Sequence, residues 1–152
     1  MTEPTAGITT TVTGVAPFGA AVPATVGGAA QARRYAESVA RAQWGAAGRG
    51  VREEDVVDLL LVVSELVTNA IRHGGGLAGF EARPTGEGLW IAVHDNSTVV
   101  PRAMYAFPTT HPGGGYGWPL VARLTRDIAV DLRPGGGKTI SALVPLRPAT
   151  AS

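Results

Sequence analysis

The sequence contains 0 cysteines among 152 residues, which excludes disulfide bonds and any metal or redox site built from thiolates. It also lacks a long apolar run, because no stretch reaches the ~18 uncharged apolar residues that a membrane-spanning helix needs. The N-terminus shows no basic segment ahead of an apolar core, so we expect no secretory signal. These absences predict a cytoplasmic protein without a membrane partner.

An excess of charge of one sign is missing as well. Lys and Arg number 13 and Asp and Glu 12, which gives a net charge of +1. Such a balance provides no large basic field for a phosphate backbone, so nucleic acid is not an expected partner. A hydrophobic content of 45% supports one domain with a real core. We expect that domain at residues 16–147, between a disordered N-terminal tail at 1–15 and a C-terminal tail at 148–152.

The rest of the chain shows the periodicities of helices and strands. Early segments repeat apolar residues at helical spacing, whereas later segments alternate or run apolar between turn residues, which predicts an α+β fold. We expect a two-layer sandwich with helices on one face of a mixed, mainly antiparallel sheet. The expected elements are a strand at 18–22, helices at 23–44, 52–73 and 116–126, a hairpin of strands at 77–83 and 89–95, an irregular lid at 96–115, and strands at 128–133 and 138–146.

The segment SELVTNAIRH at 64–73 carries a carboxylate and a carboxamide in otherwise apolar surroundings. At about 3.6 residues per turn, Glu65 and Asn69 stand on one helical face and His73 lies a further turn along. A metal-bound triphosphate needs both groups, because Asn69 can give an oxygen to Mg²⁺ while Glu65 accepts a proton from a hydroxyl or water. A solvated helix face is the alternative interpretation.

Asp95 ends an apolar strand, where its carboxylate would face a pocket. There it could accept a hydrogen bond from the exocyclic amine of adenine, and an acceptor at this place would select adenine over guanine. The alternative is an aspartate that caps the turn at Asn96 and Ser97.

Two glycine-rich segments follow. Gly115 and Gly117 precede an apolar helix that begins near Trp118, and such glycines let backbone N–H groups approach phosphate oxygens. A flexible loop that merely starts a helix is the alternative. The second segment, GGGKT at 135–139, lacks the first glycine of a P-loop and leads into a strand, so we reject a P-loop. We expect Lys138 to be an exposed turn residue rather than a phosphate ligand.

The order of these motifs resembles that of the GHKL ATPase superfamily. ELVTNAIRH resembles its N box, and VHDNS, GGGYGWPLV and GGGKTI resemble its three glycine boxes. The similarity runs from about Pro17 to Leu146, and the small size resembles the stand-alone anti-sigma-factor serine/threonine kinases of actinobacterial type. The first glycine box departs from the family pattern Asp-x-Gly-x-Gly, because Asn-Ser-Thr-Val follows Asp95 and both glycines are missing.

The resemblance implies the Bergerat fold, with ATP and Mg²⁺ as cofactors. It implies Glu65 as the catalytic base and Asn69 as the metal ligand. Thr139 stands one position beyond the family's threonine, because Lys138 takes that place. The residues implied in nucleotide binding are Asn69, His73, Asp95, Gly115, Gly117, Trp118 and Thr139.

The function that the resemblance implies is that of an ATP-binding regulatory protein. It would phosphorylate a serine or threonine of an anti-sigma antagonist and sequester a sigma factor, and a homodimer is compatible with this role. Three alternatives stay open: a nucleotide-binding switch without kinase activity, a histidine-kinase-like ATPase domain, and a purely structural interaction module.

Overall fold

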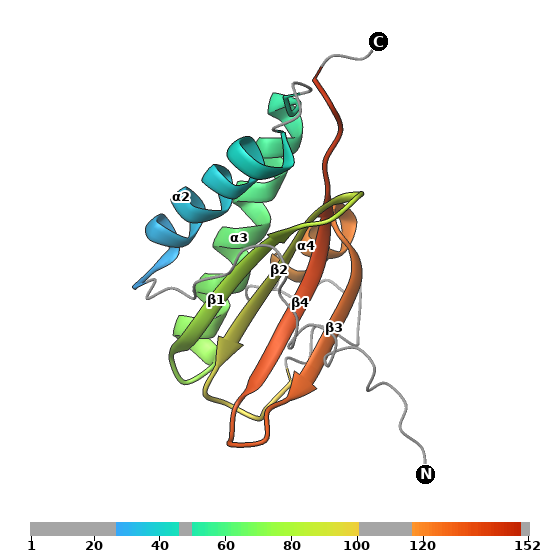
Figure 1. Cartoon of the computed structure of the whole chain (residues 1–152). Coiled ribbons are helices and arrows are strands. Elements are labelled where there is room, and N and C mark those ends of the chain that lie inside the picture. The colour runs from blue at the N-terminus through green and yellow to red at the C-terminus, as the bar shows by residue number, and fades with distance from the viewer. Residues whose placement is uncertain (1–26, 46–49, 101–116, 150–152) are drawn as a thin grey trace.

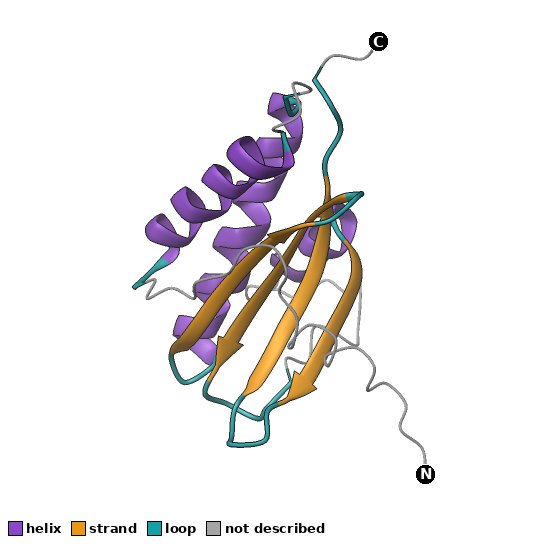
Figure 2. Ribbon diagram, viewed as in Figure 1, coloured by secondary structure: helices purple, strands orange, loops and turns teal. Residues whose placement is uncertain are grey.

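The computed structural model of the chain describes residues 27–45, 50–100 and 117–149. These residues form two layers, with the helices packed on one face of a sheet (Figures 1 and 2). The elements are α2 (Ala29–Val39), the π-helical turn η1 (Ala40–Trp44), α3 (Glu53–His73), β1 (Leu77–Pro84), β2 (Gly88–Asp95), α4 (Gly117–Leu124), β3 (Arg126–Leu132) and β4 (Lys138–Pro145). Figure 1 shows α2 and α4 on opposite sides of α3. The α+β fold class expected from the sequence is confirmed.

The sheet has four strands in the order β1-β2-β4-β3. Each neighbouring pair is antiparallel, so the described part of the sheet contains no parallel pair. The expected hairpin is confirmed as β1 and β2, and α3 covers almost the same residues as the expected N-box helix. The expected strand at 18–22 lies outside the described residues, as does residue 101 onward of the expected lid.

The core lies between α3 and the helix-facing side of the sheet. Apolar residues at helical spacing on α3 meet alternate residues of β1 and β2, which is the arrangement that their periodicities predict. The fully buried members include Leu59, Val62 and Val63 of α3 with Phe80 and Ile91 of the strands. Burying each such side chain contributes about 1.5–3 kcal/mol, and this packing fixes the register of α3 over the sheet.

A π-helical turn ends α2. The N–H of Gly45 donates to the carbonyl of Ala40 at 2.9 Å, which spans five residues instead of the four of an α-helix. The turn directs Trp44 into the core, where its Nε1 donates to the carbonyl of Thr85 at 3.0 Å. The end of α2 is therefore fastened to the turn of the β1–β2 hairpin.

Candidate functional site

The two flanks of α3 have different neighbours. On one flank, the guanidinium of Arg33 in α2 donates to Ser64 Oγ at 3.0 Å. Because an α-helix turns by about 100° per residue, Glu65 and Asn69 lie about 100° and 140° around α3 from Ser64. Both side chains therefore lie on the flank away from α2, on the side of the helical layer where α4 packs (Figure 1).

Glu65 and Asn69 are half-buried. Neither side chain has a hydrogen bond or ion pair with another residue of the described segments. A carboxylate and a carboxamide oxygen are hard oxygen donors of the kind that Mg²⁺ prefers, and this donor set fits a magnesium-bound phosphate. His73, the third expected residue of this helix, is exposed at its C-terminal end.

The C-terminal end of α3 lies directly against the end of β2. The carbonyl of Gly74 accepts a hydrogen bond from the N–H of Asn96 at 2.9 Å. A Cβ on Gly74 would clash with the carboxylate of Asp95, so a glycine is needed for this close approach. The contact places Asp95, which is 3% exposed, just beyond the last turn of the helix that carries Asn69.

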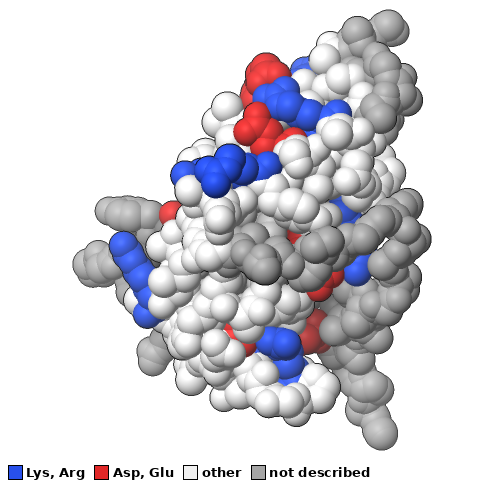
Figure 3. Space-filling model, turned by 60° about the vertical axis from the view of Figure 1, so that its left-hand side comes forward, with Lys and Arg blue, Asp and Glu red and all other residues white. Residues whose placement is uncertain are grey.

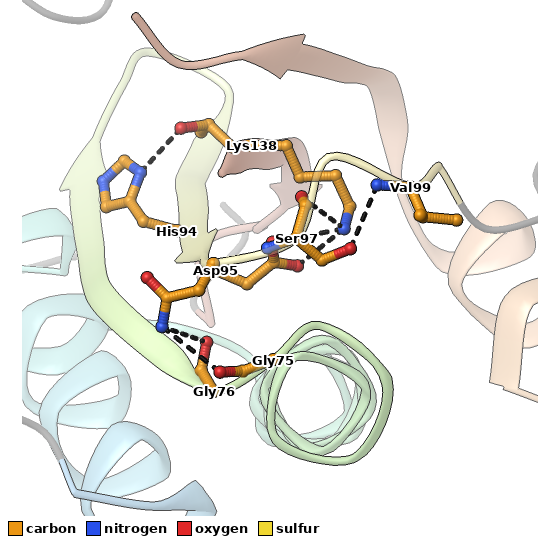
Figure 4. A network of polar contacts seen from close by, with 9 residues as sticks. Gly75, Gly76, His94, Asp95, Ser97, Val99 and Lys138 are labelled. Carbon is orange, nitrogen blue, oxygen red and sulfur yellow. Dashed lines mark hydrogen bonds and ion pairs between the residues drawn. The ribbon is translucent and has the colours of Figure 1, made fainter. Parts of the chain in front are cut away.

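Asp95 forms an ion pair with Lys138. The ammonium Nζ lies 2.9 Å from Asp95 Oδ2 and 3.1 Å from Oδ1, and it donates to the carbonyl of Ser97 at 3.2 Å. The N–H of Ser97 donates to Asp95 Oδ1 at 3.0 Å, as the turn-capping interpretation predicts. Figure 4 shows these groups converging beside α3.

The expectation that Lys138 is an exposed turn residue is wrong, because it is 2% exposed. Its place in the sheet gives the physical reason: Lys138 is the first residue of β4 and the direct cross-strand partner of Asp95. Directly opposed residues point to the same face of a sheet. The buried carboxylate thus meets a cation that balances its charge.

Thr139 lies on the other face of the sheet, because neighbouring residues of a strand alternate sides. Its Oγ1 lies 2.7 Å from His94 Nδ1, and His94 Nε2 lies 2.7 Å from Glu81 Oε2. The hydrogen bond with His94, reinforced by Arg83, holds the pKa of Glu81 below its usual range despite partial burial. In Figure 4, His94 points away from Lys138. The structure therefore does not bring Thr139 to Asp95, Glu65 or Asn69.

The second glycine segment is only partly described. Gly117 begins α4, and Trp118 is 7% exposed within the hydrophobic core. Gly115 lies outside the described residues. The geometry thus gives Trp118 a packing role and leaves the expected phosphate contacts of both glycines as predictions.

The surface agrees with the balanced composition. On the face drawn in Figure 3, basic and acidic side chains are interleaved, and the described residues form no continuous basic field there. No helix in the described segments is long and apolar enough to cross a membrane. Those segments also hold no cluster of three or more His, Cys, Asp or Glu residues that would ligate a metal.

Comparison with known families agrees with this geometry. The family model of the histidine kinase-like ATPase domain matches residues 22–142, which is most of the chain. The chain therefore belongs to the family of histidine kinase-like ATPase domains. This membership supports a GHKL-type, ATP-binding regulatory protein, and the layered α+β fold is consistent with it. No curated protein matches the chain.

Proposed function

We propose that this protein is an ATP-dependent serine/threonine kinase that acts as an anti-sigma factor. The observation that carries the proposal is the pair of half-buried side chains, Glu65 and Asn69, on the flank of α3 that faces away from α2. The chain belongs to a family of ATPase domains. Transfer of a phosphoryl group to a hydroxyl needs a group that accepts the hydroxyl proton, and the Glu65 carboxylate, close to the proposed metal ligand Asn69, can accept it.

In the proposed reaction, Asn69 gives its side-chain oxygen to the magnesium ion of the bound nucleotide. When bound, the ion would neutralise charge on the phosphates. Glu65 accepts the proton of a seryl or threonyl hydroxyl of the partner protein, whose oxygen forms a bond to the γ-phosphorus. The bond between that phosphorus and the β–γ bridging oxygen breaks, and ADP leaves. Asp95 accepts a hydrogen bond from the adenine amine.

The proposed partners are an anti-sigma antagonist, which receives the phosphoryl group, and a sigma factor, which the protein sequesters. The interleaved surface charges support protein partners over a polyanion (Figure 3). A homodimer is part of the same proposal. We place the protein in the cytoplasm, where sigma factors act.

The decisive test compares Glu65→Gln with the wild type in two assays. Gln keeps the shape of the side chain and one oxygen but accepts no proton, so phosphoryl transfer from γ-labelled ATP to candidate antagonists should fall roughly 10²–10⁴-fold. ATP affinity by calorimetry should stay within a few fold. Asp58→Asn is a matched control, because Asp58 stands about two turns earlier on the same flank, and it should change neither quantity.

A switch that binds nucleotide without transferring phosphate is the second candidate. It is favoured by the departure of the first glycine box after Asp95 and by the ion pair that already engages this carboxylate. Good ATP binding by the wild type with no transfer to any antagonist would select the switch. Transfer at the wild-type rate in Glu65→Gln would show that Glu65 is structural.

A further inference from the structure

One side of α3 carries a row of exposed apolar side chains. Val57 is 56% exposed, Leu61 42% and Ile71 46%. At about 100° per residue, Leu61 and Ile71 stand about 40° to either side of Val57. Leu66, which is 2% exposed, stands on the opposite side of the helix, toward the sheet. Single exposed hydrophobic residues are common, but a row of them on one helix face indicates an interaction surface.

This row has the spacing of a seam between two helices. We define the outer ridge of α3 as five positions that follow one another at intervals of 4, 3, 4 and 3 residues: Val57, Leu61, Ser64, Thr68 and Ile71. A helix that repeats its contacts in this way presents a narrow face to a second helix. The two middle residues are small and half-buried, so a second helix can approach closely there.

The charges beside the outer ridge are complementary to their own copy in reverse. Glu54 and Arg72 are 18 residues apart, which is about five turns, so they lie on one line along α3. Both are exposed, and neither forms a salt bridge within the described segments. The midpoint between them lies close to residue 64, as does the midpoint between Val57 and Ile71.

A two-fold axis that crosses two antiparallel copies of α3 at right angles keeps each flank of the helix on its own side. Residues on that flank then meet their counterparts from the other copy, with residue i opposite residue j and j opposite i. Glu54 of each copy would thus meet Arg72 of the other, in the register that also brings Val57 to Ile71.

We propose that the outer ridge of α3 is the surface through which two copies of this chain pair, antiparallel about a two-fold axis near residue 64. The inference rests on the homodimer of the proposed function and names its surface. Asn69 stands about 120° around α3 from Val57, so the second copy would not cover this amide. Pairing and nucleotide binding therefore use different sides of the same helix.

Pairing should be weak and reversible. One helix face is smaller than the ~800 Å² per partner of a standard stable interface, and exposed ion pairs add little. Glu65 stands about 80° from Val57, at the edge of the outer ridge, and would approach its own copy near the axis. This like-charged contact opposes pairing.

The first test is sedimentation equilibrium of the full chain, without nucleotide, between roughly 10 µM and 1 mM. The mean mass of the wild type should rise from monomer toward dimer. Leu61→Lys should raise the Kd of pairing roughly 10-fold or more. Leu132→Lys is the matched control, because Leu132 is 62% exposed but lies on β3, and it should leave the Kd unchanged. A wild type that is monomeric throughout, or equal effects of the two changes, would overturn the inference.

Exchange of charge tests the antiparallel arrangement. Glu54→Arg and Arg72→Glu should each weaken pairing, because each places like charges opposite one another. An equimolar mixture of the two variants should pair more tightly than either alone, and this advantage should shrink at high salt. Within one chain the two positions are about 27 Å apart, so only contact between copies explains such a result. A mixture that pairs no better than its components would contradict the arrangement.

Glu65→Gln tests the register near the axis. It removes the like-charged contact, so this variant should pair a few fold more tightly than the wild type in the same measurement. Weaker pairing would place Glu65 elsewhere in the interface and contradict the register.

Failure of the proposed function gives a different result from failure of this inference. A wild type that transfers phosphate but stays monomeric, or whose dimer ignores Leu61→Lys, keeps the kinase and removes the outer ridge as its surface. A wild type that pairs as expected but neither binds ATP nor transfers phosphate keeps the surface and removes the kinase.

Discussion

Two buried aspartates stand near opposite ends of α3, and they are neutralised in different ways. Asp55, at the N-terminal end, is 5% exposed and accepts hydrogen bonds from the backbone N–H and the guanidinium of Arg147 at 2.8–3.1 Å. The side chain of Arg147 is 56% exposed. Asp95, at the C-terminal end, pairs with a lysine side chain that is 2% exposed.

The difference separates a partly hydrated ion pair from a fully buried one. Arg147 stays largely hydrated, so its pairing with Asp55 fastens the strand end to the helix start at small desolvation cost. Both charges of the Asp95 pair are out of water, and such a pair often stabilises a fold no more than apolar residues of the same size would. It lies just beyond the last turn of α3, the helix that carries Glu65 and Asn69.

The largest expected effect comes from removing the cation at each end. Lys138→Met leaves the Asp95 carboxylate buried with only one N–H donor, so we expect a loss of about 3–5 kcal/mol in the free energy of unfolding. Arg147→Met leaves Asp55 the backbone N–H and the positive end of the α3 dipole, and Arg147 is largely hydrated, so the loss should be smaller. Urea unfolding of both variants measures the two losses. Equal losses would erase the distinction between the ends.

The next effect concerns ligand binding along α3. Asn69→Ala should weaken magnesium-dependent ATP binding roughly 10-fold or more, because it removes the proposed metal ligand. Asp58→Ala is the control: Asp58 lies on the same flank of α3 but nearer to Asp55, so this change should leave magnesium-dependent ATP binding unchanged. Calorimetry with magnesium and with a chelator measures the dependence. If magnesium enhances binding equally in Asn69→Ala and the wild type, Asn69 is not the ligand.

The smallest effect is the response of the Asp55 end to acid. Burial alone would raise the pKa of Asp55, but the hydrogen bonds from Arg147 outweigh it and hold the pKa below the ordinary value of 3.8. A carboxyl group with a lowered pKa in the folded state stabilises the protein above its unfolded pKa, and this contribution is lost as pH falls. Asp55→Asn should cost about 1–2 kcal/mol at neutral pH.

The difference between Asp55→Asn and the wild type should then shrink as pH falls below 3.8. Unfolding free energies of both proteins between neutral and acid pH measure this. A difference that stays constant over the range would show that the charge of Asp55 contributes nothing.

Most of the fold could be predicted because its signals are local. Apolar spacing and an acidic first turn predicted α3, and two apolar segments around Thr85 and Gly86 predicted the hairpin. The shared flank of Glu65 and Asn69 also followed from helix periodicity alone. Two helix boundaries were less accurate: α2 begins only at Ala29, after Gly27 and Gly28, instead of at 23, and α4 ends at Leu124, because Arg126 already begins β3.

The Asp95–Lys138 pair could not be predicted from either local pattern. A glycine turn before Lys138 suggested exposure, whereas the pairing of β2 with β4 buries this residue against Asp95. That pairing joins residues 43 positions apart in sequence. The available signal was that Asp95 and Lys138 carry opposite charges and would face each other if β2 and β4 were neighbours in this register. Using this signal required knowledge of the strand order. Because neighbouring residues of a strand point to opposite faces of the sheet, Thr139 lies on the other side from Lys138 and outside the site.

The π-helical turn at Ala40–Trp44 is equivalent to a helix with one inserted residue. If the same residues wound as a regular α-helix, at about 100° per residue, Trp44 would rotate around the axis and its indole would leave the carbonyl of Thr85. Deleting a single residue should instead restore the α-helical hydrogen bonds without this rotation, because the wider turn absorbs one residue. Sequences of the same fold that keep the tryptophan but lack the π turn should therefore be one residue shorter here.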